Sequence, residues 1–326
     1  MSTAAVPVTP DDVARATRLV GSRLHRTPSL GSRTLGESFG GTAVLKAELF
    51  QRTGSFKPRG ILAKIASLSP AERERGVITI SAGNAAAAVA FGAASEGIDA
   101  LVVMASGASP AKVAATRSYG ATVDLEAETL PEAYERMQAL QRESGRTLVH
   151  PFDDETVVAG HASLGLEIVE QTPDVDVVVV PVGGGGLISG VALGVKHARP
   201  KARIVAVEPE GSAALRLALE AGQPVAIDPV SVADGLNAPF AGEVCIAVCQ
   251  ELVDDAITVT EDEIHAGFRF VYQRAKLAAE PAGAVSTAAI LAGRVPGLEE
   301  KTVVAVVSGG NVAAETASAI LAPDEA

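Results

Sequence analysis

Residues 177–190 read Val-Val-Val-Val-Pro-Val-Gly-Gly-Gly-Gly-Leu-Ile-Ser-Gly, and this stretch decides the fold class. A continuous run of β-branched apolar residues indicates a strand buried on both faces, as in a parallel sheet. The glycines after it predict a tight turn, and the apolar residues that follow predict a covering helix. A strand followed at once by a helix is the repeating unit of α/β proteins.

The same alternation continues along the chain from about residue 40. Segments of helical composition, such as 131–144 and 212–221, separate the strand-like runs. An earlier helix is expected from Thr9, a capping residue followed by Pro10, to about Leu24. We therefore expect an α/β protein with covered, parallel sheets. The expected strands are residues 43–49, 77–80, 100–104, 121–125, 147–150, 175–180, 203–207 and 302–307.

The composition favours a cytoplasmic globular protein with a small-molecule ligand. The net charge of −12 argues against nucleic acid and anionic membranes as partners. No segment resembles a signal peptide, and no apolar run reaches membrane-spanning length. With Cys245 and Cys249 as its two cysteines, the chain offers no disulfide framework and no cysteine-rich metal site.

Three strand-to-helix turns carry the candidate binding groups. Ser81-Ala82-Gly83-Asn84 follows the strand at 77–80, and Ser308-Gly309-Gly310-Asn311 follows the strand at 302–307. The third is the glycine turn at 183–186, whose unshielded N–H groups at a helix start form an anion site. Ligands of open α/β sheets sit outside the carboxyl ends of the strands, where such turns gather.

Lys57 is the candidate nucleophile. It lies in Thr53-Gly54-Ser55-Phe56-Lys57-Pro58-Arg59-Gly60, between a strand and a helix. Pro58 disfavours a helical conformation at Lys57 and suits the first position of the helix. An amine there can be partly desolvated, which lowers its pKa and makes it reactive toward a carbonyl group.

Three functional classes fit some of these features. A dinucleotide enzyme would use the glycine turn and Glu208, but the third glycine of its fingerprint is absent, since Ile188 or Ser189 stands there. A binder of small anions would need no lysine. A pyridoxal-phosphate enzyme needs an amine, a phosphate cradle, and polar groups for the phenolic oxygen and the ring nitrogen, and all are present.

The ordered motifs of the chain resemble those of the serine/threonine dehydratase family of pyridoxal-phosphate enzymes. The resemblance runs from His25-Arg26-Thr27-Pro28 to the turn at 308–311 and includes Glu280-Pro281-Ala282-Gly283. It implies two open, twisted, mostly parallel sheets flanked by helices, the tryptophan synthase β-like fold (PLP fold type II). It further implies a large cofactor domain formed by residues 1–46 and 150–326, a small mobile domain at 47–149, and a homodimer.

The resemblance also implies roles for individual residues. Lys57 would be the Schiff-base lysine and general base, and Phe56 would pack on the cofactor ring. Asn84 would contact the phenolic oxygen, and the Ser308 hydroxyl would face the ring nitrogen. The phosphate loop would be Gly183, Gly184, Gly185 and Gly186. The substrate carboxylate would bind at Ser81, Ala82, Gly83, Asn84 and Ala85.

The implied activity is α,β-elimination from a β-hydroxy amino acid, which releases a 2-oxo acid and ammonia. L-Threonine, L-serine and bulkier analogues remain open as substrates. The alternatives are another β-elimination or β-replacement enzyme, or an amino-acid racemase, of the same fold. A racemase of the family carries Ser where this chain has Ala82, so efficient racemisation is not expected.

Several positions depart from the family pattern. Ala85 replaces a usual His, which represents either drift or a change of substrate. Glu208 and Ser212 match a cation site, but Ala214 replaces its Asp, so we expect a weak, monovalent or absent site. His161 replaces a usual Gln, and we expect it to be buried and satisfied by hydrogen bonds rather than to bind a ligand.

Overall fold

The computed structural model describes residues 6–322 and places most strands in a large sheet. This sheet has six strands in the order β1-β2-β10-β7-β8-β9. All neighbouring strands are parallel except the edge strand β1, which pairs antiparallel with β2. The strands are β1 Ser29–Gly31, β2 Thr42–Ala47, β7 Val177–Pro181, β8 Arg203–Pro209, β9 Asp255–Val259 and β10 Thr302–Val307.

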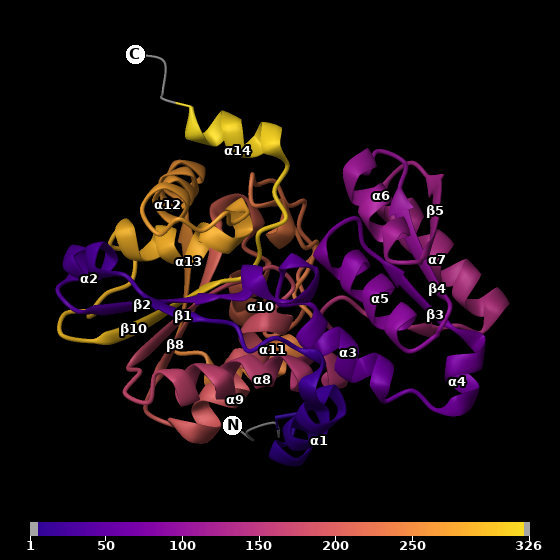
Figure 1. Cartoon of the computed structure of the whole chain (residues 1–326), viewed down its shortest axis with the longest axis horizontal. Coiled ribbons are helices and arrows are strands. Elements are labelled where there is room, and N and C mark those ends of the chain that lie inside the picture. Colours follow the sequence, from indigo (N-terminus) through magenta and orange to yellow (C-terminus); the bar gives the residue numbers. More distant parts are fainter. Residues whose placement is uncertain (1–5, 323–326) are drawn as a thin grey trace.

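A second, smaller sheet is formed by a central segment of the chain. Its four strands are all parallel and lie in the order β5-β4-β3-β6. Figure 1 shows this sheet, with α4 to α7, as a separate lobe at one end of the molecule. The strands are β3 Val77–Ile80, β4 Ala100–Ala105, β5 Thr122–Ala127 and β6 Thr147–Leu148.

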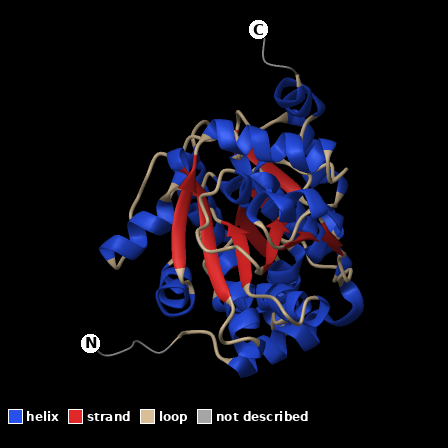
Figure 2. Ribbon diagram, turned by 90° about the vertical axis from the view of Figure 1, so that its left-hand side faces the viewer, coloured by secondary structure: helices blue, strands red, loops and turns tan. Residues whose placement is uncertain are grey.

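Helices cover both faces of the large sheet (Figure 2). Val177 and Val179 pack with α12 and α13, whereas Val178 and Val180 pack with α8 and α9 on the opposite face. Successive side chains of a strand point to opposite faces, so a strand covered on both sides needs apolar residues at every position. The covering helices of this sheet are α2 Arg33–Phe39, α8 Glu155–Gln171, α9 Gly186–Ala198, α10 Ala214–Ala221, α11 Glu243–Leu252, α12 Glu261–Gln273 and α13 Pro281–Leu291.

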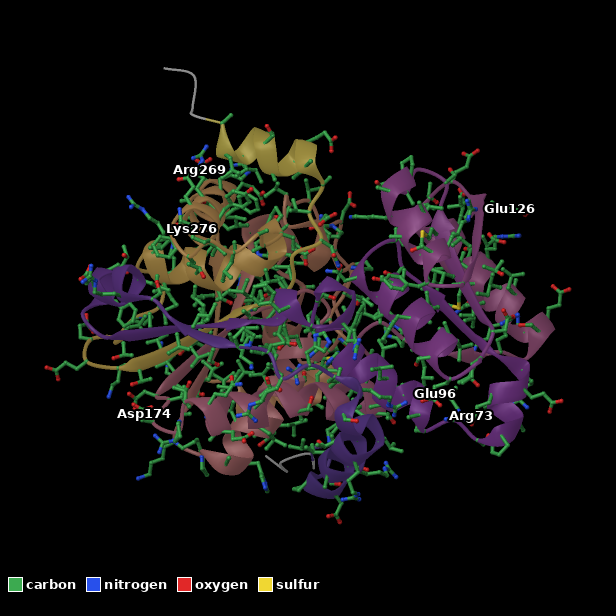
Figure 3. The ribbon with its side chains drawn as sticks, in the orientation of Figure 1. Arg73, Glu96, Glu126, Asp174, Arg269 and Lys276 are labelled. Atoms are coloured by element: carbon green, nitrogen blue, oxygen red, sulfur yellow. The ribbon has the colours of Figure 1, made fainter. Side chains whose placement is uncertain are left out.

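The small sheet is covered in the same way. Val77 packs with α3 and α5 on one face, and Ile78 packs with α7 on the other. Side chains fill the space between the ribbons, and Arg73 and Glu96, 3.0 Å apart, join α4 to the end of α5 (Figure 3). The remaining helices are α1 Pro10–Val20, α3 Pro58–Ala66, α4 Pro70–Arg75, α5 Asn84–Ser95, α6 Pro110–Ser118, α7 Leu130–Ser144 and α14 Ala314–Leu321.

The predicted α/β class with covered, mostly parallel sheets is confirmed. The strands expected at 77–80 and 302–307 have those bounds, and the other expected strands differ at their ends by up to two residues. The edge strands β1 and β9 were not expected, and α1 ends at Val20 rather than near Leu24. Within residues 6–322, no helix combines the length and the apolar character needed to cross a membrane.

Candidate active site

The predicted lysine, glycine turn and serine meet in one cavity. It lies where β7 and β10 end. Parallel strands end at the same edge of a sheet, which is why turns distant in sequence come together here. The cavity is lined by Phe56, Lys57, Phe152, Pro181, Val182, Gly183, Gly184, Gly185, Gly186, Leu187, Ile188, Gly235, Leu236 and Ser308.

Lys57 presents a partly desolvated amine to this cavity. Its Nζ donates a hydrogen bond to the carbonyl oxygen of Pro151 at 2.8 Å and lies 5.1 Å from the ring centroid of Phe56. Burial disfavours the charged amine and lowers the pKa of Lys57 to about 8, although Cys245 and Glu280 act in the opposite direction. The predicted lowering of this pKa therefore agrees with the environment of the side chain.

The backbone of Lys57 differs from expectation. Pro58 begins α3 as predicted, but Lys57 has φ −50° and ψ −39°, a helical conformation that a following proline disfavours. Surrounding hydrogen bonds hold it there. The N–H of Phe56 donates to the carbonyl of Ser308 at 3.0 Å, and the Lys57 carbonyl accepts the first helical bond from Ile61 at 3.1 Å. The prediction of a non-helical Lys57 was wrong, because tertiary contacts outweigh the local preference.

The four glycines form a crowded turn at the N-terminus of α9. Gly185 caps this helix with φ 95° and ψ −10°, a left-handed conformation that favours glycine. A Cβ atom on Gly183 would lie 2.9 Å from the carbonyl oxygen of Leu236, and one on Gly184 would overlap the ring of Phe152. The free N–H groups and the positive end of the helix dipole make this turn suited to an anion.

Asn84 is fixed by two partners, Glu280 and Asn311, whose roles were not predicted from the sequence. Its Nδ2 donates to Oε1 of Glu280 at 2.7 Å, and its Oδ1 accepts from Nδ2 of Asn311 at 2.8 Å. The same Asn311 Nδ2 donates to the carbonyl of Thr53 at 2.7 Å, in the loop that carries Lys57. One signal for Glu280 was present: it is a single carboxylate in the small apolar run Ala278–Ala282.

The buried carboxylate of Glu280 predicts a pH dependence of stability. Burial, and then the negative charge of Asp234, raise the pKa of Glu280 to about 7, whereas the Asn84 hydrogen bond and Lys112 lower it. In the window from about pH 4.5 to about 7, the folded state holds a proton that the unfolded state releases, so stability falls as pH rises. Relative to a Glu280→Gln variant, the cofactor-free wild type should lose up to about 3 kcal/mol of unfolding free energy between pH 5 and 8.

Urea denaturation at several pH values measures this difference. The exposed Glu251 offers a matched control, since a Glu251→Gln variant should follow the wild-type profile. An unfolding free-energy difference between the wild type and Glu280→Gln that stays constant over this range would contradict the assignment.

The Ser81–Ala85 turn stands beside the cavity rather than in its lining. It connects the end of β3 to α5, with Asn84 as the first helical residue and the Gly83 N–H bonded to the Ser81 hydroxyl at 3.1 Å. Ala85 is buried, with 4% of its surface exposed. The turn joins the rest of the site through Asn84 and its partners Glu280 and Asn311.

The residues matched to a cation site do not provide a suitable ligand set. Both Glu208 oxygens accept backbone N–H groups of α10, from Leu215 at 2.7 Å and from Arg216 at 2.8 Å. Burial raises the pKa of Glu208 to about 7 despite these bonds. The Ser212 hydroxyl donates to the Leu236 carbonyl, and residues 6–322 contain no cluster of three or more His, Cys, Asp and Glu side chains arranged for a metal.

His161 is buried, as expected, but the expected hydrogen bonds are missing. Neither ring nitrogen has a partner among the described residues, and the ring contacts Phe56 edge-on at 4.9 Å. Burial, and then the charges of Lys57 and Arg59, hold the pKa of His161 well below its usual value, so the ring is neutral. The described protein groups therefore do not supply the hydrogen bonds that were expected for this ring.

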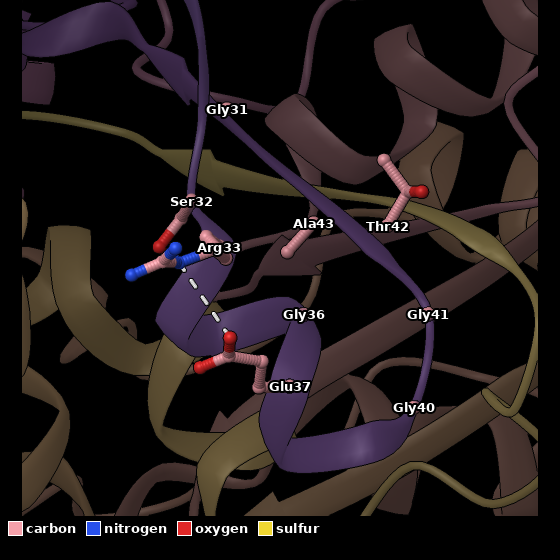
Figure 4. A pocket seen from close by; sticks show the side chains of 9 residues that line it. All are labelled: Gly31, Ser32, Arg33, Gly36, Glu37, Gly40, Gly41, Thr42 and Ala43. Carbon is pink, nitrogen blue, oxygen red and sulfur yellow. Dashed lines mark ion pairs between the residues drawn. The ribbon is translucent and has the colours of Figure 1, made fainter.

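A second hollow lies away from these groups. It opens between β1, α2 and β2, where Figure 4 shows the ion pair of Arg33 and Glu37 at 3.5 Å. Both side chains of this pair are largely exposed, and none of the predicted site residues lines the hollow. Its chemistry gives no reason to place the reaction there. It is lined by Gly31, Ser32, Arg33, Gly36, Glu37, Gly40, Gly41, Thr42 and Ala43.

Comparison with known families identifies the protein class. A model described as pyridoxal-phosphate dependent enzyme matches residues 21–309. The chain belongs to the pyridoxal-phosphate-dependent enzyme family. The matched range contains Lys57, the turns at 81–84 and 183–186, and the first two residues of the turn at 308–311. The cofactor of this family member is therefore pyridoxal 5'-phosphate.

Curated relatives of this pyridoxal-phosphate enzyme are named for one kind of reaction. An L-threonine ammonia-lyase of Thermotoga maritima is 42% identical over 306 residues, which cover 94% of this chain and 76% of the relative. The catabolic L-threonine dehydratase TdcB of Escherichia coli is 38% identical over 309 residues, 94% of each chain. The predicted resemblance to serine/threonine dehydratases is confirmed.

Solved structures of other pyridoxal-phosphate enzymes share the fold. Maize serine racemase superposes with a TM-score of 0.91 at 34% identity, covering 95% of both chains. A T.th. threonine deaminase has a TM-score of 0.87 at 38% identity, covering 94% of this chain and 99% of that one. The predicted tryptophan synthase β-like fold, PLP fold type II, is confirmed.

The cavity has the donor set that pyridoxal phosphate requires. Its glycine turn has no room for side chains and presents N–H groups to an anion. Its lysine has a pKa of about 8, so the uncharged amine that can bind an aldehyde is far more abundant near neutral pH than in an ordinary lysine. Ser308 offers a buried hydroxyl at the same cavity. These residues fit the cofactor.

Proposed function

We propose that the chain is a dehydratase, or ammonia-lyase, that converts a β-hydroxy amino acid to a 2-oxo acid and ammonia. The substrate is L-threonine, L-serine or a bulkier analogue. One observation carries the proposal: the Lys57 amine, with its pKa near 8, shares a cavity with an anion-binding turn and a serine hydroxyl. The names of the curated relatives support the same reaction.

Lys57 has two tasks in the proposed site, and each of the other residues has one. Lys57 holds the cofactor and then takes the α-proton of the substrate as general base. The N–H groups of residues 183–186 would hold the phosphate. Phe56 would pack on the ring, and Asn84 would contact the phenolic oxygen. When bound, the cofactor supplies an electron sink that acidifies the α-proton. Ser308 would face the ring nitrogen. A hydroxyl there would make the cofactor a moderate electron sink, which suits prompt loss of a β-substituent.

The substrate carboxylate is proposed to bind at the turn Ser81–Ala85. The N-terminus of α5 begins there, and its N–H groups suit a carboxylate. Ala82 has no proton to deliver to the face opposite Lys57, which favours elimination over racemisation even though a serine racemase shares the fold. Another β-elimination or a β-replacement remains the alternative reaction.

The domain organisation belongs to the same proposal. Residues 1–46 and 150–326 would form the large domain, and residues 47–149 the small one that moves over the substrate. The separation of the strands into two sheets, with β3 to β6 together, supports this division. We also propose a cytoplasmic homodimer. The ligand set at Glu208 and Ser212 argues for a weak or absent cation site, and no step depends on it.

Purified protein with pyridoxal phosphate, mixed with L-threonine, L-serine and L-threo-phenylserine, tests the reaction by release of the 2-oxo acid. Absence of 2-oxo acid release with all three substrates would overturn the proposed reaction.

Ala85 is the residue that is proposed to decide between the substrates. Restoring an imidazole with Ala85→His should raise the activity ratio of threonine to phenylserine about tenfold, because it refills space beside the substrate.

The control for this substitution is Ala111→His. Ala111 is also the second residue of a helix, α6, but it is exposed. This variant should keep the wild-type ratio. An unchanged ratio in Ala85→His as well would mean that the alanine is drift and does not select the substrate.

A further inference from the structure

The loop that carries Lys57 is closed at its two ends by a buried ion pair. Glu48 follows β2 directly, and Arg59 is the second residue of α3. The Arg59 Nε and Nη2 atoms donate to the two Glu48 oxygens at 2.7 and 2.8 Å. The side chains are 0% and 1% exposed. This bidentate contact fixes the separation between the ends of the loop.

The pair belongs to a charge-balanced cluster that reaches α8. Arg59 Nη2 also donates to Glu167 Oε2 at 3.0 Å, and Lys46 Nζ donates to Glu167 Oε1 at 2.6 Å. Two cations thus face two carboxylates. Lys46 also contacts the Thr27 carbonyl at 2.7 Å. The cluster therefore anchors the start of α3 to β2, to α8 and to the segment before β1.

Stability alone is a poor explanation for this arrangement. Removing charges from water is costly, and buried ion pairs can often be replaced by apolar residues without loss of stability. Arg59 also places a positive charge in the first turn of a helix, where the helix dipole disfavours it. The charges of Glu48 and Glu167 compensate for both penalties. The geometry that the cluster imposes on the loop carrying Lys57 is the better explanation.

The enclosed loop adopts a conformation that needs external restraint. Thr53 has φ 59° and ψ 13°, a left-handed conformation that is unfavourable for a β-branched residue. Lys57 is helical although a proline follows it. On the cavity side, the loop bonds to residues 308–311, including the Gly310 N–H to the Gly54 carbonyl at 2.9 Å. The ion pair supplies the restraint on the opposite side.

We propose that Arg59 is a positioning residue that, with Glu48, fixes the loop and thereby the position of the Lys57 amine in the cavity. The inference rests on the proposed role of Lys57. It assigns Arg59 no contact with substrate or cofactor. Its consequence is that geometry at Arg59, and not merely positive charge, governs cofactor attachment and turnover.

The Arg59→Lys holoenzyme tests this inference, since lysine keeps the charge but cannot form the bidentate contact with Glu48. We expect the dissociation constant for pyridoxal phosphate to rise about tenfold and kcat at saturating cofactor to fall at least about tenfold, because small displacements of a catalytic group are costly. Arg136→Lys is the control. Arg136 forms a similar contact with Asp124, at 2.6 Å for both bonds, between α7 and β5. It should change neither quantity more than about twofold.

A double variant separates positioning from stability. Arg59→Met with Glu48→Leu removes one charge of each sign and leaves Lys46 and Glu167 paired. We expect the double variant to have a higher melting temperature than Arg59→Met alone, closer to the wild-type value. Its kcat and cofactor affinity should remain reduced. Wild-type kcat and cofactor affinity in Arg59→Lys, or in the double variant if the former does not fold, would overturn the inference.

A wrong assignment of Lys57 as the cofactor-binding lysine would give a different result from a wrong assignment of Arg59. Borohydride reduction of the wild-type holoenzyme, followed by peptide mass analysis, locates the attached cofactor. A cofactor found on another lysine refutes the role of Lys57 itself. A cofactor found on Lys57, together with unchanged behaviour of the Arg59 variants, refutes only the positioning role.

Discussion

Replacing Lys57 with alanine is expected to lower 2-oxo acid formation at least about 1000-fold, because one side chain performs two tasks. The amine holds the cofactor and takes the α-proton. It is suited to both, since burial lowers its pKa to about 8. Roughly a tenth of the amine is then uncharged at pH 7, far more than for an ordinary lysine. The assay is 2-oxo acid release with saturating pyridoxal phosphate, combined with the visible absorbance of the attached cofactor.

Lys64→Ala provides the matched control for this experiment. Lys64 lies on α3, the helix that Lys57 precedes, and forms an ion pair with Asp154 at 2.5 Å. Its loss removes a partly exposed contact and should change activity only slightly. If Lys57→Ala retained both borohydride-reducible cofactor and turnover, another amine would have to be the attachment point, and the assignment of Lys57 would be wrong.

Much of the fold could be predicted because its strands are covered on both faces. Four consecutive valines leave few alternatives to a buried strand, and β7, β3 and β10 were located from such runs. The edge strands escaped prediction for the opposite reason. β1 has three residues and is largely exposed, and β9 is only half-buried, so neither needs a continuous apolar run.

The sequence predicted those groups of the site that stand in recognisable short motifs. The lysine, the glycine turn and the serine each stand at a strand-to-helix junction, and the topology brings such junctions to one edge. Glu280 and Arg59 could not be placed in this way, because their contacts form only when the chain folds: Arg59 pairs with Glu48 across the loop between β2 and α3, and both residues also have partners distant in sequence. Glu280 meets Asn84 across 196 positions, and Arg59 meets Glu167 across 108.

Replacing Gly185 with alanine is expected to weaken pyridoxal phosphate binding about 100-fold. Two costs combine at this residue. Its φ of 95° is disfavoured for a residue with a Cβ atom, and the added Cβ would lie 2.7 Å from the Cβ of the buried Cys245. Either α11 or the glycine turn must then move. A moved turn no longer aims its N–H groups at the phosphate.

Cofactor titration, followed by the visible absorbance of the bound form, measures this loss. Gly107→Ala is the control, because a Cβ there meets no atom within 4 Å and its φ is not positive. The temperature of unfolding of the cofactor-free protein shows where the strain is relieved. A lowered temperature with wild-type affinity would mean that α11 yields and the turn keeps its shape, which would contradict the expected loss. Weakened binding with nearly unchanged stability would show that the glycine turn itself gives way, because it is held more loosely than the helix packed against it.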